Sequence, residues 1–193
     1  MKHLLSFAIA FIAFSSFVHA QEINYFSPDQ YGVTNYTEEI AITMPKETAY
    51  QFVEAWLNAN IQATATPTKT AELISFPAII NTKKSYNPFS GTYTENLTFG
   101  FDISFTDGSV KLDMKNFGLQ FFYEGWGSSA KIRMIGDDIR EINAMKEDLA
   151  NNSSLSKKEK KEIQSKIDDL QESVEAANKE LNKRLNALRS RLK

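Results

Sequence analysis

Two aspartates on neighbouring predicted strands have a spacing that could support chemistry. Asp102 and Asp113 lie on either side of Asp107-Gly108, in two segments that alternate apolar and polar residues. Asp-Gly between two such segments predicts a tight hairpin, commonly closed by a type I′ turn. If the loop has two residues, the two carboxylates face each other on the polar side of the sheet. Such a pair could hold a cation or act in acid–base catalysis.

The alternative is that the aspartate pair is neutralised by its neighbours. Lys111 and Lys115 lie diagonally across from Asp102 in the same predicted hairpin. Like charges directly opposite each other destabilise a sheet, and nearby cations relieve that cost. Calcium takes six or more oxygen ligands, so two carboxylates alone are too few for it. We favour neutralisation, and whether the pair binds a cation stays open.

Two aromatic residues could form a binding platform. Tyr123 and Trp126 stand in the run FGLQFFYEGWG, where Gly125 and Gly127 flank the tryptophan. An exposed tyrosine and tryptophan could contact a sugar or a peptide. The alternative, which we favour, is that these loop aromatics fold back onto the sheet.

Histidine and cysteine are missing from most of the chain. The two histidines are His3 and His19, and there is no cysteine. This removes histidine bases, Ser-His-Asp and Cys-His nucleophiles and the usual zinc sites from everything after residue 20. The sequence therefore predicts a non-enzymatic protein with no catalytic residue, no cofactor and no metal site.

Residues 1–20 have the features of a signal peptide. Lys2 precedes a short apolar stretch over 4–18, and Val18-His19-Ala20 is typical of a cleavage site after Ala20. The stretch is short for a membrane span, although a retained anchor is the alternative. We expect a secreted or periplasmic protein with no membrane span after cleavage.

Charge is unevenly distributed along the chain. Residues 21–136 contain 8 Lys/Arg against 12 Asp/Glu, which disfavours a nucleic-acid partner. Residues 179–193 contain six basic residues and one acid. This basic end could contact an anionic envelope surface; the alternative, which we favour, is that cations suit a helix C-terminus.

Hydrophobic periodicity predicts the elements that position these residues. Period two indicates strands, and apolar residues at helical spacing indicate helices. We expect an extended lead-in over 21–34 that lies along the body, and a long loop or loose hairpin over 82–95. The predicted strands are 35–43, 71–81, 96–106, 109–116 and 130–135. The predicted helices are 45–60 and 137–150. Pro77 argues that its strand is an edge strand or carries a bulge. This order predicts an α+β domain over 35–152, an antiparallel sheet with helices on one face. The predicted core residues are Phe52, Val53, Trp56, Leu57, Phe99, Phe101, Ile103 and Phe105.

A long helix is predicted over 153–193. Ser156 and Glu159 have capping-box spacing at its start. Its apolar residues recur every three or four positions, with one irregular step at Leu181 to Leu185, as in a coiled coil. This coiled-coil stripe is Ile163, Ile167, Leu170, Val174, Leu181, Leu185, Leu188 and Leu192. The stripe needs a partner: another copy, which we favour, the helix at 137–150 in an intrachain hairpin, or a different protein.

The chain resembles a known family over 35–151. The chain has a signal peptide, a strand, the helix PKETAYQFVEAWL and then a hairpin, with Asn116-Phe117 after the Asp-Gly turn. In this order it resembles an uncharacterised secreted bacterial domain-of-unknown-function family with a TATA-binding-protein-like (TBP-like) fold. Where that family usually carries Lys and Arg around the turn, this chain has Thr106 and Val110. The resemblance implies the fold and no functional residue, because the family has no established activity.

Two functions follow from these observations. The first is a secreted or periplasmic interaction protein that uses the coiled-coil helix for self-association or for a protein partner. The alternative is a small hydrophobic-ligand-binding protein, in which the sheet curls in a helix-grip manner and the Phe-rich face lines a cavity. An apolar cavity would take up a hydrophobic fluorophore in the native state, and a packed core would not.

Overall fold

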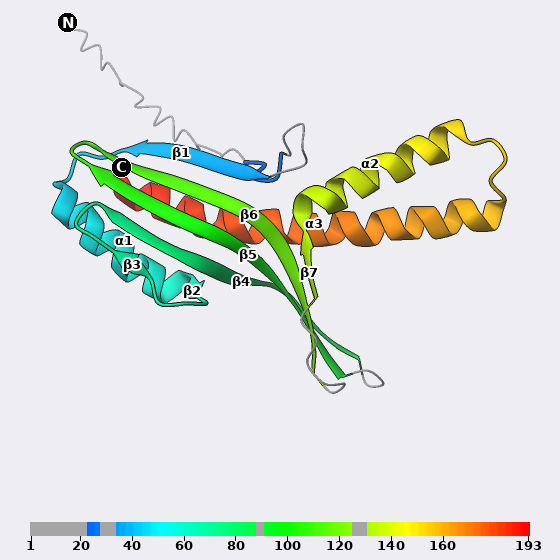
Figure 1. The fold of residues 1–193 in the computed structure, drawn as a ribbon, viewed down its shortest axis with the longest axis horizontal. Helices are drawn as coiled ribbons and strands as arrows, with labels where there is room; N and C mark the ends of the chain where they lie inside the picture. The colour runs from blue at the N-terminus through cyan, green and yellow to red at the C-terminus, as the bar shows by residue number, and fades with distance from the viewer. Residues whose placement is uncertain (1–22, 28–33, 88–90, 125–130) are drawn as a thin grey trace, which may run out of the picture.

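A computed structural model describes residues 23–27, 34–87, 91–124 and 131–193. It has one antiparallel sheet with helices packed against one face, followed by a long C-terminal helix, as predicted (Figure 1). The elements are β1 (Asn35–Ala41), α1 (Lys46–Asn60), β2 (Gln62–Ala63), β3 (Thr68–Lys69), β4 (Leu73–Asn87), β5 (Gly91–Thr106), β6 (Ser109–Glu124), β7 (Lys131–Met134), α2 (Ile135–Asn151) and α3 (Lys157–Leu192). The expected signal peptide lies outside the described residues.

The sheet is built around the hairpin that the sequence predicts. The strand order is β1-β6-β5-β4-β2, while β3 pairs with β4 and β7 with β6. Asp102 pairs directly with Asp113, so the two-residue loop and its register are confirmed. The turn is not type I′, however, because Gly108 has a positive φ of 95° and Asp107 does not. Type I′ requires positive φ at both central residues.

Asn116 forms a bulge that explains the Asn116-Phe117 pair of the motif. It has φ 57°, and the β5–β6 register shifts opposite it, between Thr98 and Gly100. Asparagine enters the left-handed region more readily than most residues do. The extra residue keeps both Met114 and Phe117 on the buried face, because without it the strand alternation would put one of them outside.

The region predicted as a loop over 82–95 differs in the structure. There β4 and β5 continue as a paired hairpin to Asn87 and Gly91, with the β4–β5 irregularity between Asn81 and Lys83. Pro77 lies inside β4, and its carbonyl accepts a hydrogen bond from the Thr64 amide at 2.9 Å, on the β2 side. The N–H and C=O of a strand residue point the same way, so the proline removes no donor from the β4–β5 ladder.

The hydrophobic core lies between the sheet and the two helices α1 and α3. Phe99, Phe101, Ile103 and Phe105 of β5 are at most 3% exposed. On α1, Val53, Trp56 and Leu57 are buried and belong to the same cluster, while Phe52 is half-buried against it. The predicted core is therefore confirmed, and the Phe-rich face is packed against helices.

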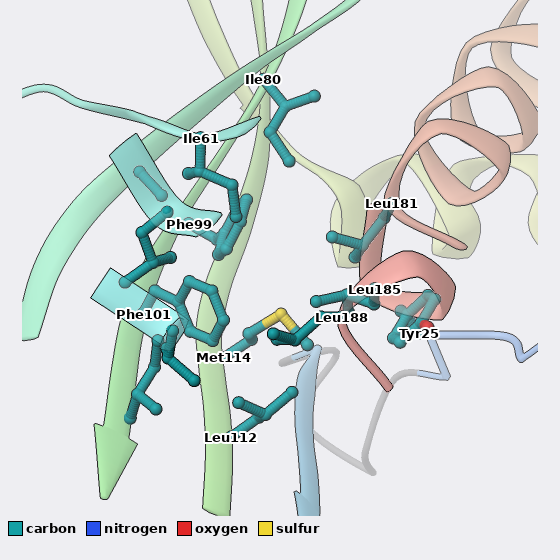
Figure 2. Packing of buried hydrophobic residues seen from close by; sticks show 14 of the residues in the cluster. Tyr25, Ile61, Ile80, Phe99, Phe101, Leu112, Met114, Leu181, Leu185 and Leu188 are labelled. Atoms are coloured by element: carbon teal, nitrogen blue, oxygen red, sulfur yellow. The ribbon is translucent and has the colours of Figure 1, made fainter. Parts of the chain in front are cut away.

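The C-terminal half of α3 belongs to this same core. Leu181, Leu185, Leu188 and Leu192 are 0% exposed and lie in one cluster with the sheet residues. Figure 2 shows Leu185 and Leu188 pointing from α3 toward Met114. The predicted coiled-coil stripe is thus covered from within the chain, by a surface that the sequence analysis did not consider. Self-association through it would require α3 to leave the core.

The N-terminal half of α3 packs against α2. Ile142, Ile167 and Leu170 form a second buried cluster, with Met145, Leu149 and Ile163 partly buried around it. The two helices project beyond the sheet as a helical hairpin (Figure 1), which we call the α2–α3 arm, residues 139–170. Of the three partners considered for the stripe, the intrachain hairpin is the one present here, and Val174 lies between the arm and the main core.

The predicted capping box at the start of α3 is confirmed. The Ser156 amide donates to Glu159 Oε2 at 2.8 Å, and the Glu159 amide donates to Ser156 Oγ at 3.3 Å. Two donors that a helix start leaves free are satisfied in this way. The hydrogen bonds from the Ser156 hydroxyl and amide lower the pKa of Glu159 below its ordinary value.

Candidate functional site

A groove lies between the last turn of α1 and the inner side of β4. The helix ends at Asn60, and extended Ile61 leads straight into β2, which pairs with Ala78 and Ile79. This tight connection holds the end of α1 above the sheet edge, and α3 contributes Arg184. We call the hollow the α1–β4 groove; its volume is about 500 Å³. Its lining residues are Glu54, Leu57, Asn58, Ala59, Asn60, Ile61, Gln62, Ala63, Pro67, Lys69, Ile74, Phe76, Ile79, Ile80, Asn81 and Arg184.

The floor of the groove is apolar. Leu57, Ile61, Ile74, Phe76 and Ile80 line it, and each is at most 7% exposed. Figure 2 shows Ile61 and Ile80 at the end of the core where Phe99 lies. A concave apolar floor with a few polar groups around it is the usual composition of a small-molecule site, and the volume is within the usual range for such sites.

The rim of the groove carries charged residues. Lys69 Nζ lies 2.6 Å from Glu54 Oε1, so this pair is closed on itself. The hydrogen bond to Glu54 raises the pKa of Lys69 above its ordinary value, so the lysine stays charged. On the opposite side the rim residue is Arg184, whose Nη2 lies 3.1 Å from Glu180, a carboxylate outside the groove lining. The lining residues therefore carry two cations, Lys69 and Arg184, for the one carboxylate of Glu54.

Arg184 is held in place by the end of α1. Its Nη1 donates to the Asn60 carbonyl, one of the carbonyls that a helix end leaves free. The Nε atom of Arg184 is buried and has no hydrogen-bond partner among the described residues. A buried donor without an acceptor costs free energy. The Arg184 side chain as a whole is 24% exposed, so part of its guanidinium can be contacted from the groove.

The groove can bind and orient a molecule. Its polar side chains are one carboxylate, two cations and several amides, and the carboxylate is already paired. Within residues 23–27, 34–87, 91–124 and 131–193, no three His, Cys, Asp or Glu side chains lie close enough to hold a metal ion. No helix in that part of the chain is long and apolar enough to cross a membrane.

The predicted aspartate pair is neutralised by Lys115. Its Nζ lies 3.2 Å from Asp102 Oδ2 and 3.0 Å from Asp113 Oδ2, so it bridges the two carboxylates. The hydroxyl of Ser75 donates to Asp102 Oδ1 at 2.5 Å, and that of Thr37 donates to Asp113 Oδ1 at 3.2 Å. Thr37, Asp113, Asp102 and Ser75 form one row across β1, β6, β5 and β4. The favoured interpretation is confirmed for Lys115.

The predicted aromatic platform falls on side chains that lie outside the described part of the structure. Tyr123 lies in β6, with its backbone opposite Tyr93, and Trp126 lies outside the described residues. The site contact predicted for these two residues therefore stays a prediction.

A buried charged network joins the two ends of the described chain. Arg189 Nη2 donates to Tyr25 Oη at 2.8 Å and to Glu38 Oε2 at 2.6 Å, and Nε donates to Glu38 Oε1 at 2.7 Å. Burial alone would lower the pKa of Arg189, but its hydrogen bonds to Glu38 and Tyr25 raise it. Burial raises the pKa of Tyr25 to about 12, although the bond from Arg189 opposes this. These groups support the fold.

Two asparagines of α3 bind the backbone of the lead-in. The Tyr25 amide donates to Asn178 Oδ1 at 3.1 Å, and the Ile23 amide donates to Asn182 Oδ1 at 3.1 Å. Asn182 Nδ2 returns a bond to the Ile23 carbonyl at 2.8 Å. Tyr25 and Phe26 are 1% exposed, so this part of the lead-in lies along the body, as predicted.

Sequence reasoning missed Arg184 and Arg189 as structural contacts. Both stand in the basic end that was interpreted as a solvated helix terminus. The available signal was helical position: Arg184 precedes Leu185 and Arg189 follows Leu188, so both stand beside the apolar stripe. An arginine at the edge of such a stripe can turn toward the core when a hydrogen-bond acceptor faces it. Only the tertiary structure shows which acceptors face Arg184 and Arg189.

Two solved structures are similar to this chain. One is a TBP-like protein from Parabacteroides distasonis, with 13% sequence identity and a TM-score of 0.40 over 80% of this chain and 97% of that chain. The other is a DUF4468 family protein from Bacteroides ovatus, with 12% identity and a TM-score of 0.40 over 79% of this chain and 90% of that chain. No protein-family model and no curated protein matches the sequence. The structural neighbours are thus bacterial and of the TBP-like, domain-of-unknown-function kind that the sequence resembles. The likeness concerns the backbone and brings no ligand, activity or partner to this chain.

Proposed function

We propose that this is an exported, non-enzymatic binding protein that takes a small hydrophobic molecule in the α1–β4 groove. The observation that carries the proposal is the groove itself, about 500 Å³ with a floor of buried Ile, Leu and Phe side chains. The absence of His and Cys after residue 20 supports binding over catalysis. The signal-like residues 1–20 support export.

The ligand site differs from the one that the sequence suggested. The Phe-rich face is packed against helices, and Phe99, Phe101 and Phe105 are not part of the lining of the α1–β4 groove. The groove lies instead where α1 ends and α3 does not fully cover β4. Burial of an apolar ligand there is favourable by roughly 25 cal/mol for each Å² of apolar surface removed from water.

Uptake of a neutral hydrophobic fluorophore tests the proposal. Nile red should bind the native protein at one saturable site. Ala63 lines the groove, and Ala63→Trp should fill it and abolish uptake. Ala150→Trp, at an exposed position near the end of α2, is the matched control and should bind as the original chain does. Equal uptake by both variants would exclude the groove as the site.

A protein interaction at the sheet edge is a second candidate function. Ile132 and Met134 of β7 are 56% and 39% exposed, which is unusual for large apolar side chains. Because the chain has no cysteine, Met134→Cys would introduce a unique position for a photo-crosslinker. A single cross-linked product in envelope preparations, reduced by Ile132→Ser, would support this second function, and no product would exclude it.

A further inference from the structure

The charges that line the α1–β4 groove indicate which class of ligand it binds. This inference rests on the proposed function. The two charged edges of the groove differ. The edge formed by Glu54 and Lys69 is a closed pair at 2.6 Å, so it offers no unpaired charge to a ligand. On the α3 side the lining residue is Arg184, and its counter-ion Glu180 is not part of the lining.

Arg184 is the cation that faces the groove. Its guanidinium is fixed on two sides, by the Asn60 carbonyl and by Glu180, and it lines the hollow next to the apolar floor. Its Nε–H is buried and has no acceptor among the described residues. The group is therefore oriented before any ligand arrives, and its side chain is 24% exposed. A carboxylate could bind that exposed part at little cost in side-chain entropy.

We infer that the groove binds small monocarboxylic acids, with the apolar body on the Ile61–Phe76–Ile80 floor and the carboxylate on Arg184. One carboxylate matches Arg184, the lining cation that no lining carboxylate neutralises. Glu180 keeps its contact with Lys183 when Arg184 turns part of its charge to the ligand. A dianion would exceed the single net positive charge of the lining residues, and an uncharged ligand would leave that charge without a partner in the groove.

The negative end of α1 is the group that opposes this assignment. The free carbonyls at a helix C-terminus carry partial negative charge, and the groove lies beside Asn58 and Asn60. Arg184 already binds the Asn60 carbonyl, so that partial charge is compensated where the carboxylate would lie.

The experiment compares two ligands that share one apolar body. The affinities of 4-phenylbutanoate and 4-phenylbutan-1-ol for the full protein are measured by calorimetry. A hydrogen bond to a charged group is stronger than a neutral one, so the carboxylate should bind roughly ten-fold or more tightly than the alcohol. Equal affinities in the original chain overturn the inference, and this arm needs no variant.

Variants then assign the preference to Arg184. Arg184→Gln shortens the apolar stem and removes the charge, so the ratio of the carboxylate affinity to the alcohol affinity should fall to about one. Lys183→Gln removes an exposed cation from the same helix and should keep the preference. A preference that persists in Arg184→Gln overturns the inference. Failure of both ligands to bind, or unchanged binding of both to Ala63→Trp, instead overturns the proposed function.

Discussion

The two halves of α3 carry one continuous apolar pattern and pack against different partners. In the C-terminal half, Leu181, Leu185 and Leu188 are completely buried in the sheet core. In the N-terminal half, Ile167 and Leu170 are buried against α2, in a cluster with three buried residues that projects beyond the sheet. The same kind of stripe therefore belongs to the main core at one end of the helix and to a small satellite core at the other.

This difference shows why the stripe was interpreted as a coiled coil. Steps of three and four residues place apolar side chains along one side of a helix whatever covers them. The irregular step from Leu181 to Leu185 lies in the half that packs on the sheet. A helix that packs against a sheet does not have to keep the supercoil that a strict heptad imposes. The irregular spacing is therefore compatible with the sheet as the packing partner of this half.

The largest expected contrast is between Leu185→Ala and Ile167→Ala. Each leaves a cavity, but Leu185 is surrounded by the main core and Ile167 by two projecting helices that can move together. We expect Leu185→Ala to lower the free energy of unfolding by about 4 kcal/mol and Ile167→Ala by about 2 kcal/mol. Urea denaturation measures both. Equal losses would mean that the arm and the body form one cooperative unit.

The second expected effect concerns the charged network of the sheet half. Arg189→Met leaves the Glu38 carboxylate, 19% exposed, without its cation, so we expect a loss of about 3 kcal/mol in unfolding free energy. Arg191→Met, in the same last turn and exposed, is the matched control and should change it by less than about 0.5 kcal/mol. Similar values for the two arginines would contradict the assigned role of Arg189.

A smaller effect is expected in the arm. Ser156→Ala removes the hydroxyl that accepts from the Glu159 amide and should cost about 1 kcal/mol. We expect the arm to open independently of the body, so amide hydrogen exchange should rise in α2 and at the start of α3 and stay unchanged around Leu185. A uniform rise along the whole helix would show that the two halves open together.

The smallest expected effect is a difference in pH response between the halves. Burial raises the pKa of Tyr25 to about 12, so its contribution to stability is complete below pH 10 and is lost as pH rises through 12. The pKa of Glu159 is lowered, so its contribution is present above its ordinary pKa and is lost as pH falls through the lowered value. Tyr25→Phe should therefore weaken the alkaline dependence of stability, and Glu159→Gln the acid dependence. Urea denaturation across pH measures both, and unchanged profiles would contradict the two contributions.

Much of the fold could be predicted from local sequence. The hairpin register, the pairing of Asp102 with Asp113 and the capping box at Ser156 depend on residues close together in the chain. The strand extensions over 82–95 could not, because Thr82 to Thr94 lack clear apolar alternation and are held by pairing with each other. The turn type also escaped prediction, since Asp-Gly is compatible with more than one set of backbone angles.

The candidate site could not be predicted. The α1–β4 groove combines residues from α1, β2, β3, β4 and α3, and Arg184 meets the Asn60 carbonyl across 124 positions of sequence. Neither end of that contact has a local signature. Packing geometry decides whether a hollow remains between two elements.

The sequence by itself determined most of the helices and strands, the central hairpin, and the fact that the apolar stripe of α3 must be buried against another apolar surface. Alternation of period two and steps of three and four residues encode those features locally. Only the tertiary structure decided that the sheet and α2 supply that surface, that Arg189 turns inward to Glu38, and that a groove remains beside α1. The reason is that the hydrophobic effect specifies how much apolar surface must be buried but has no direction, so the choice of partner depends on which surfaces the folded chain brings together.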